Sequence, residues 1–249
     1  MSNSSSGIII GRKPVLDALR GGSSLAGIWI DRTMKGPEEI DIRTIAREKG
    51  IPLKRVSKTV LNQKTRANHQ GVLAYTAPIT FHDPETVISH LYSQGKVPFI
   101  LYLDRIQDVG NLGSIIRTAE VMGVHAIVIP SQKMAVINDQ VVKISAGAIR
   151  YIPICRISQV GEAMQLFHNL GLKIIASDLN ASRKITETDM TVPLCCVIGS
   201  EDTGISDLVR DAADDLFLIP QAGKTESLNA AVATGMILFE AFRQRESGQ

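Results

Sequence analysis

The chain has 249 residues and a formal net charge of +2, with 44% of its residues hydrophobic and 21% charged. This ordinary globular composition excludes disorder, a collagen-like repeat or a coiled coil as a description of the whole chain. No apolar run approaches the ~20 residues of a membrane-spanning helix, and the polar residues 1–6 lack the apolar stretch of a secretion signal, so we expect a cytoplasmic protein with no membrane partner.

The first 80 residues alternate short helical and strand patterns. A helix is expected to begin near Pro14, which suits a first helical position, and to end before Gly21. Ala77 and Pro78 close this unit, so we expect domains 1–80 and 81–249. The predicted elements are a helix at 14–19, a strand at 27–31, a helix at 38–49, and strands at 51–56 and 72–76.

This first segment holds most of the excess positive charge. Residues 1–80 contain 13 Lys and Arg against 6 Asp and Glu, whereas residues 81–249 contain 14 against 19. No acidic residue occurs between Glu48 and Asp83. Such an excess fits a surface that binds a polyanion such as nucleic acid, and it fits equally a basic surface that is merely solvated.

The second segment alternates strands and helices. Its first helix is expected to begin at Asp83, Pro84 and Glu85, which supply a cap, a first-position proline and an early acid. Apolar runs without polar alternation predict strands that are buried on both faces. Strands are predicted at 97–103, 126–129, 173–176, 194–198 and 216–219, and helices at 112–122, 160–170, 205–213 and 228–243. This order predicts an α/β fold with a mostly parallel sheet and helices on both faces, with ligands bound beyond the carboxyl ends of the strands.

Three loops at those strand ends hold the candidate functional residues. In loop 108–119 a glycine-containing turn leads into a helix whose apolar arc leaves Arg117 on the opposite side, where a solvated charge is the simplest interpretation of that residue alone. Loop 197–205 combines Glu201 with Gly199, which allows another group to approach the backbone closely. In loop 219–230, Ser227 and Asn229 begin a helix of small residues and are suited to cap it.

The histidines and cysteines predict no metal site. The five histidines lack the spacing of metal ligands. The cysteines are odd in number, and Cys195 and Cys196 are adjacent within an apolar run. We therefore expect no disulfide framework, and we interpret Cys155, Cys195 and Cys196 as small core residues.

Together, the three loops resemble the signature motifs of the SpoU (TrmH) family of RNA ribose methyltransferases, within the SPOUT class. N-x-G-x-x-x-R-T-A matches at 111–119, I-G-x-E-x-x-G-I at 198–205, and I-P-x-x-G-x-x-x-S-L-N at 219–229. The resemblance covers roughly residues 83–249, and Val109, Asp202 and Gln221 depart from the residues that many members carry. The stretches 10–19 and 68–72 are similar to the small substrate-binding domain that precedes the catalytic domain in many members.

The resemblance implies methylation of a ribose 2'-hydroxyl in structured RNA, most closely a guanosine of 23S rRNA, with S-adenosylmethionine as the cofactor. It also implies a C-terminal trefoil knot and a homodimer that pairs through the knot region and the last helix. The residues expected to bind the cofactor are Gly199, Ile219 and Leu228. The expected catalytic residue is Arg117, with Asn111, Glu201, Ser227 and Asn229 around it. The residues expected to bind RNA are Arg12, Lys13, Lys54, Arg55, Lys58 and Arg66.

Proposals for the family that the chain resembles make the arginine at the position of Arg117 the general base. A guanidinium is a poor base at neutral pH, so we expect Arg117 to hold a phosphate of the nucleotide and to stabilise the forming alkoxide. Glu201 would either position Arg117 or accept the proton through water.

Other functions also fit the sequence. One is a tRNA 2'-O-methyltransferase of the same family, and another is a non-catalytic RNA-binding protein of ribosome assembly. A nucleotide-dependent dehydrogenase is disfavoured, because the spacing G-x-G-x-x-G is absent from the glycine turn. The target nucleotide and the maturation state of the RNA stay open.

Overall fold

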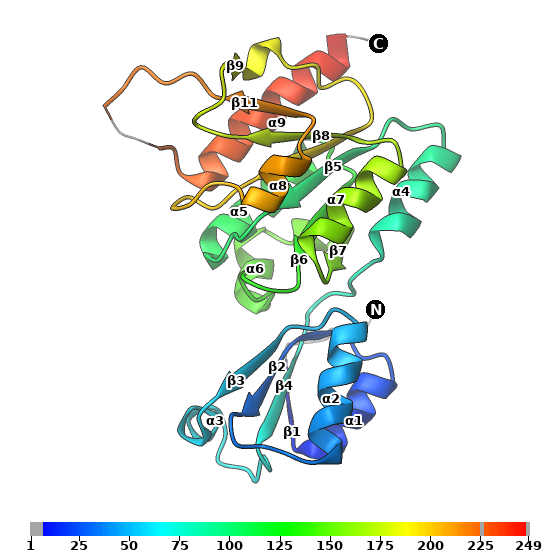
Figure 1. Cartoon of the computed structure of the whole chain (residues 1–249), viewed down its shortest axis with the longest axis vertical. Helices are drawn as coiled ribbons and strands as arrows, with labels where there is room; N and C mark the ends of the chain where they lie inside the picture. The colour runs from blue at the N-terminus through cyan, green and yellow to red at the C-terminus, as the bar shows by residue number, and fades with distance from the viewer. Residues whose placement is uncertain (1–6, 225–226, 248–249) are drawn as a thin grey trace. The chain divides into compact units, whose positions relative to one another are not determined.

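The chain folds into two compact units in the computed structural model, which describes residues 7–224 and 227–247 (Figure 1). One unit contains the described residues up to Thr80 together with Val136–Asp139, and the other contains Phe81–Ala135 and the described residues from Gln140 onward. Residues 1–6, on which the expectation of no secretion signal rests, lie outside the described range.

The N-terminal unit is built on a four-stranded sheet with the order β1-β4-β2-β3. β2 and β3 are parallel, and β4 runs antiparallel to both β1 and β2. The elements in chain order are β1 (Ile8–Ile10), α1 (Arg12–Arg20), β2 (Leu25–Asp31), α2 (Pro37–Glu48), β3 (Leu53–Val56), α3 (Lys58–Lys64) and β4 (Val72–Thr76).

Helices pack on both faces of this sheet. On one face, Leu19 of α1 and Ile42 of α2 pack with Ile30 of β2. On the other face, Leu61 of α3 packs with Leu73 of β4. β1 and α3 were not predicted from the sequence, because elements of three and seven residues are too short to show a clear hydrophobic period.

The C-terminal unit is built on a seven-stranded sheet with the order β7-β6-β5-β10-β8-β11-β9 and parallel pairing throughout, which confirms the predicted α/β fold. Two short 3-10 turns, Ala148–Arg150 and Ile185–Glu187, accompany the longer elements. These elements are α4 (Pro84–Ser93), β5 (Phe99–Leu103), α5 (Val109–Val121), β6 (Ala126–Pro130), α6 (Asp139–Ile144), β7 (Ile154–Ile157), α7 (Val160–Asn169), β8 (Lys173–Ser177), β9 (Arg183–Lys184), β10 (Leu194–Ile198), α8 (Asp207–Ala212), β11 (Asp215–Leu218) and α9 (Ala230–Ser247).

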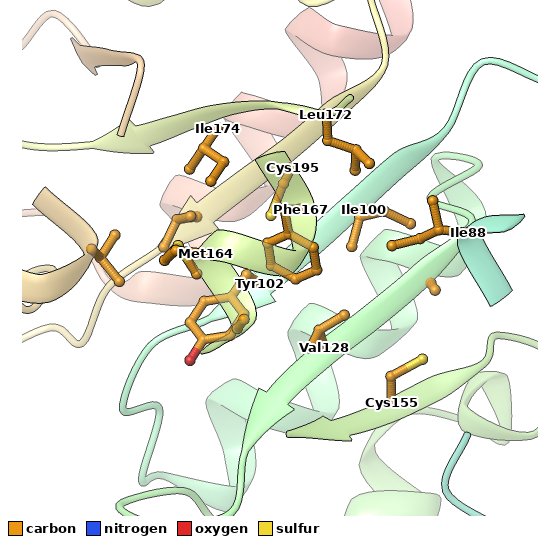
Figure 2. Close-up of a cluster of buried hydrophobic side chains, with 14 of the residues drawn as sticks. Ile88, Ile100, Tyr102, Val128, Cys155, Met164, Phe167, Leu172, Ile174 and Cys195 are labelled. Carbon is orange, nitrogen blue, oxygen red and sulfur yellow. The ribbon is translucent and has the colours of Figure 1, made fainter. Parts of the chain in front are cut away.

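Successive side chains of the central strands point to opposite faces of the sheet, and a layer of helices covers each face. Every position of these strands is therefore buried, which explains their continuous apolar runs. Figure 2 shows one of these layers, where Phe167 and Met164 of α7 pack over Tyr102 of β5 and Cys195 of β10. α4 and α8 belong to the same layer. α5 and α9 pack against each other, and α9 lies on the other side of the sheet in Figure 1.

The three cysteines belong to this core. Cys155, Cys195 and Cys196 are buried free thiols, as predicted, and burial raises the pKa of Cys155 to about 12. They are therefore unreactive packing residues at neutral pH. No helix in the described part of the chain has the length and apolar character to cross a membrane.

Candidate active site

Three polar side chains from separate loops meet beyond the carboxyl ends of β5, β10 and β11. Nδ2 of Asn229 donates to Oδ1 of Asn111 at 2.9 Å and to Oε2 of Glu201 at 3.2 Å. Nδ2 of Asn111 donates to the same oxygen of Glu201 at 3.3 Å. The structure thus brings together one predicted residue from each of the three loops.

Backbone contacts hold the two asparagines in this cluster. Oδ1 of Asn229 accepts from the N–H groups of Ala231 at 3.0 Å and Val232 at 3.3 Å, so Asn229 caps α9 as predicted. This leaves its Nδ2 to face Asn111 and Glu201. Asp108 caps α5 and accepts from the N–H of Asn111 at 2.7 Å, which fixes the first turn that carries Asn111.

Glu201 lies on a tight turn that Gly199 makes possible. Ser200 and Gly204 exchange two backbone hydrogen bonds of 3.0 and 2.9 Å, and Gly204 has a φ of +62°. A Cβ on Gly199 would overlap the backbone of Gly204 and Ile205. The group that approaches Gly199 closely is therefore the chain's own turn, which the sequence analysis did not identify.

Two residues that the sequence analysis missed brace this turn. Asp104 is fully buried at the end of β5 and accepts from the N–H of Ser206 at 2.6 Å. Arg105, with a φ of +65°, donates from Nη2 to the carbonyl of Gly204 at 3.0 Å. The available signal was an acidic and a basic residue directly after the apolar run 97–103, at the strand end where ligands bind.

A pocket of about 250 Å³ lies along the same turn. The three predicted cofactor residues, Gly199, Ile219 and Leu228, all line it, as does Ser227. Further apolar lining comes from Ile198, Leu218, Ala230 and Ala233, and polar lining comes from Asp178, Asn180, Glu201 and Arg210. Arg210 forms an ion pair with Asp178 at the pocket edge.

Arg117 lies apart from the cluster and the pocket. Its side chain is exposed on α5, pointing away from the core as predicted. It forms no hydrogen bond or ion pair with any other residue in 7–224 and 227–247. A guanidinium without an internal partner is free to meet a phosphate, but this chain alone does not place it against Glu201.

The predicted RNA-binding residues fall into two groups. Arg12 pairs with Glu38 at 2.8 Å and Arg55 pairs with Glu39, so both hold the N-terminal unit together. Lys13, Lys58 and Arg66 are exposed, and Lys54 is exposed beside the ring of Trp29.

Within the described residues, no group of histidine, cysteine, aspartate and glutamate is arranged to hold a metal ion.

Two family models match the chain, one for each unit. The model described as the SpoU rRNA methylase family matches residues 98–239. The model described as RNA 2'-O ribose methyltransferase substrate binding matches residues 8–82. The first match spans all three loops that supply Asn111, Glu201 and Asn229.

Named relatives agree with these models. The chain is 34% identical to a putative TrmH family tRNA/rRNA methyltransferase, YacO, of Bacillus subtilis, over 95% of both chains. The SpoU methyltransferase AviRb of Streptomyces viridochromogenes, solved with the cofactor AdoMet, aligns with a TM-score of 0.63 and 25% identity over 98% of this chain and 92% of that one. An AdoMet-bound rRNA methyltransferase from Sinorhizobium meliloti aligns with a TM-score of 0.62 and 27% identity over 96% of this chain and 88% of that one.

Proposed function

The chain belongs to the SpoU rRNA methylase family and is an S-adenosylmethionine-dependent RNA methyltransferase, and we propose that its target is the ribose 2'-hydroxyl of a guanosine in 23S rRNA. The observation that carries the proposal is the meeting of Asn111, Glu201 and Asn229 beside the pocket lined by Gly199, Ile219 and Leu228.

The pocket suits S-adenosylmethionine. Ile219, Leu228 and Ala233 form an apolar wall that fits the adenine ring, and backbone groups of the loops can read the edge of the base. The carboxylate of Asp178 and the amide of Asn180 suit the ribose hydroxyls. Gly199 lets the backbone of Gly204 and Ile205 pack directly against it, which sets the position of the turn that lines the pocket.

The bound cofactor supplies a methyl group that its sulfonium has already activated. The protein's own contribution is to align the acceptor hydroxyl and to assist loss of its proton. Alignment of this kind contributes on the order of 7–11 kcal/mol. Glu201, held by the amide N–H groups of Asn111 and Asn229, presents a fixed carboxylate that can accept this proton directly or through water. This chain alone does not bring Arg117 to Glu201, so Arg117 would reach this site from a partner copy of the chain, where it would hold the phosphate and stabilise the developing alkoxide.

Mapping 2'-O-methylation on total RNA, with and without this protein, tests the target. The proposal expects loss of one guanosine modification in 23S rRNA when the protein is absent, and its return when the purified enzyme and S-adenosylmethionine are added. A lost tRNA modification instead identifies the alternative tRNA enzyme. Unchanged RNA, together with no calorimetric binding of S-adenosylmethionine, identifies a non-catalytic RNA-binding protein.

We assign RNA binding to a domain at residues 1–80, whose basic surface supports the role. Lys13, Lys58 and Arg66 are three of the predicted RNA-binding cations, and each is exposed and forms no ion pair with another described residue. Replacing all three with glutamine should reduce the slope of log affinity against log salt by roughly 0.7–0.9 for each phosphate that the variant no longer neutralises. Filter binding at several salt concentrations measures the slope, and calorimetry should give an unchanged affinity for S-adenosylmethionine.

A matched control uses a cation that is already paired. Arg20 bonds to Asp41 at 3.0 Å, so Arg20→Gln should leave the slope almost unchanged. An unaltered slope in the triple variant would count against this surface.

We also propose a homodimer that pairs through α9. Val232, Met236 and Phe239 form one stripe along α9 and are 50%, 47% and 57% exposed, and Val121 of the adjacent α5 is 67% exposed. An apolar patch of this kind marks an interaction surface. Val121 lies one turn from Arg117, so pairing here also encloses the surroundings of Arg117.

The dimer has a direct test. Phe239→Glu should convert the protein from dimer to monomer in analytical ultracentrifugation, because a desolvated carboxylate is costly at a paired apolar surface. Ile40→Glu is the control, since Ile40 is an exposed apolar residue of α2 in the N-terminal unit. A monomeric parent protein, or a dimeric Phe239→Glu, would contradict the interface.

The C-terminal trefoil knot belongs to the same proposal. Its support is that the chain after β11 returns to contact Asn111 and Glu201 through Asn229 before α9 packs on α5. A knot would hold the loops that carry Asn111, Glu201 and Asn229 close to one another through the path of the chain itself. We also propose that the reaction takes place in the cytoplasm, where this RNA substrate would be found.

A further inference from the structure

One face of the sheet in the N-terminal unit carries the chain's only tryptophan. α1 and α2 cover the opposite face, and α3 covers part of this face, where Trp29 packs against the cluster that Leu61 of α3 forms with Leu73. In the strand register, Trp29 lies between Lys54 and Leu73. The next row on the same face places Tyr75 between Gly27 and Ile8.

Because Gly27 has no side chain, this second row leaves a hollow next to the two rings. We call it the aromatic hollow and define it by Ile8, Gly27, Trp29, Lys64 and Tyr75. Val136, Ile137 and Asn138 line it as well. It has a volume of about 360 Å³, and all of its lining residues belong to the N-terminal unit. Trp29 and Tyr75 are only half-buried, so their rings contribute to its accessible wall.

The rings and cations of the aromatic hollow are arranged for a flat ligand that carries negative charge. The centroids of Trp29 and Tyr75 are 5.2 Å apart, with their planes at 63°. The ammonium groups of Lys54 and Lys64 lie 5.8 and 5.5 Å from the centroid of the Trp29 ring. Lysine side chains rotate readily, so a ligand that stacks on the ring can move them outward while retaining their charge.

Tyr75 adds an unused polar group. Its hydroxyl is buried and has no hydrogen-bond partner among the residues that the structure describes. Burial raises the pKa of Tyr75, so the hydroxyl stays protonated and is available as a donor at neutral pH. An acceptor on the edge of a ligand would satisfy this hydroxyl once a shift of the surrounding side chains brings it to the surface of the hollow.

We propose that the aromatic hollow binds an unpaired nucleobase of the RNA substrate, with the base stacked on Trp29 and the flanking phosphates held by Lys54 and Lys64. Single-stranded RNA is recognised in this way, through aromatic stacking platforms beside cations. The net positive charge of the first 80 residues favours such a ligand. This inference rests on the proposed function, because it assumes that this unit holds the RNA.

The single tryptophan makes the hollow directly observable. Titrating the full-length protein with a short single-stranded oligoadenylate should quench the fluorescence of Trp29, because a stacked base lies against the indole. The same oligonucleotide with abasic residues keeps the phosphates and removes the bases, so it should bind through its charge and leave Trp29 emission unchanged. Equal quenching by both oligonucleotides would overturn the stacking site.

Three variants separate stacking from folding. Trp29→Leu should weaken oligoadenylate binding by roughly 5- to 150-fold, the cost of losing one stacked base. Trp29→Phe should restore most of that affinity. Tyr75→Phe keeps the ring and the fluorescent reporter, and should weaken binding of oligoadenylate by roughly 2- to 12-fold without affecting the abasic oligonucleotide.

The controls distinguish failure of the hollow from failure of the proposed function. Circular dichroism and calorimetric binding of S-adenosylmethionine verify that each variant is folded. If 23S rRNA is methylated normally by the parent protein and by folded Trp29→Leu, with equal KM, the hollow is not an RNA site and the proposed function stands. If the parent protein neither binds nor methylates RNA, the proposed function itself fails and the hollow with it.

Discussion

Replacing Arg117 with lysine is expected to lower turnover by about 100- to 1,000-fold while the affinity for S-adenosylmethionine stays the same. The range corresponds to loss of one preorganised donor to a developing oxyanion. Lysine keeps the charge, but it cannot reproduce the planar fork with which arginine binds phosphate through two hydrogen bonds. Because Arg117 has no internal partner within the described residues, the variant leaves the bonds of the fold intact.

Single-turnover methylation of the RNA substrate measures this loss, with thermal unfolding as the test of integrity. Arg150→Lys is the control, since Arg150 is also an exposed arginine of the C-terminal unit. Added guanidinium should partly restore turnover to Arg117→Ala and should not affect Arg150→Ala. Near-full turnover in Arg117→Lys would show that the guanidinium fork is not required.

The fold follows from the sequence where burial dominates. β5 and β10 were predicted because a strand between two helical layers requires apolar residues at every position, and such runs are conspicuous. β7 and β9 were missed for the opposite reason. Arg156 interrupts the short run of β7, and β9 consists only of Arg183 and Lys184, so neither has the pattern of a buried strand.

For the candidate active site, the sequence predicts which loops contribute residues but not the contacts between those residues. Strand order implied that Asn111, Glu201 and Asn229 lie at one edge of the sheet, but no local pattern encodes hydrogen bonds across 90 and 118 residues. For the same reason, the ion pairs of Arg12 and Arg55 could not be predicted from the sequence. Their partners Glu38 and Glu39 lie 26 and 16 residues away, so charge counting placed both arginines with the RNA-binding cations.

Gly199→Ala is expected to reduce kcat/KM by about 100-fold or more, through loss of cofactor affinity and displacement of Glu201. The added methyl group would overlap the backbone of Gly204 and Ile205, and backbone cannot rotate aside as a side chain can. The turn must therefore open, which breaks the paired hydrogen bonds between Ser200 and Gly204. A displacement of about 1 Å at reacting groups is enough for a loss of that size.

Gly161→Ala is the matched control, because a Cβ at this position of α7 meets nothing within 4 Å. It should retain full activity and gain about 0.5–1 kcal/mol in free energy of unfolding, since alanine suits a helix better than glycine does. Calorimetry should show weakened binding of S-adenosylmethionine for Gly199→Ala and parent-like binding for Gly161→Ala. If Gly199→Ala bound the cofactor normally, the pocket beside this turn would not be its site, because the substitution must alter the wall formed by residues 199–205.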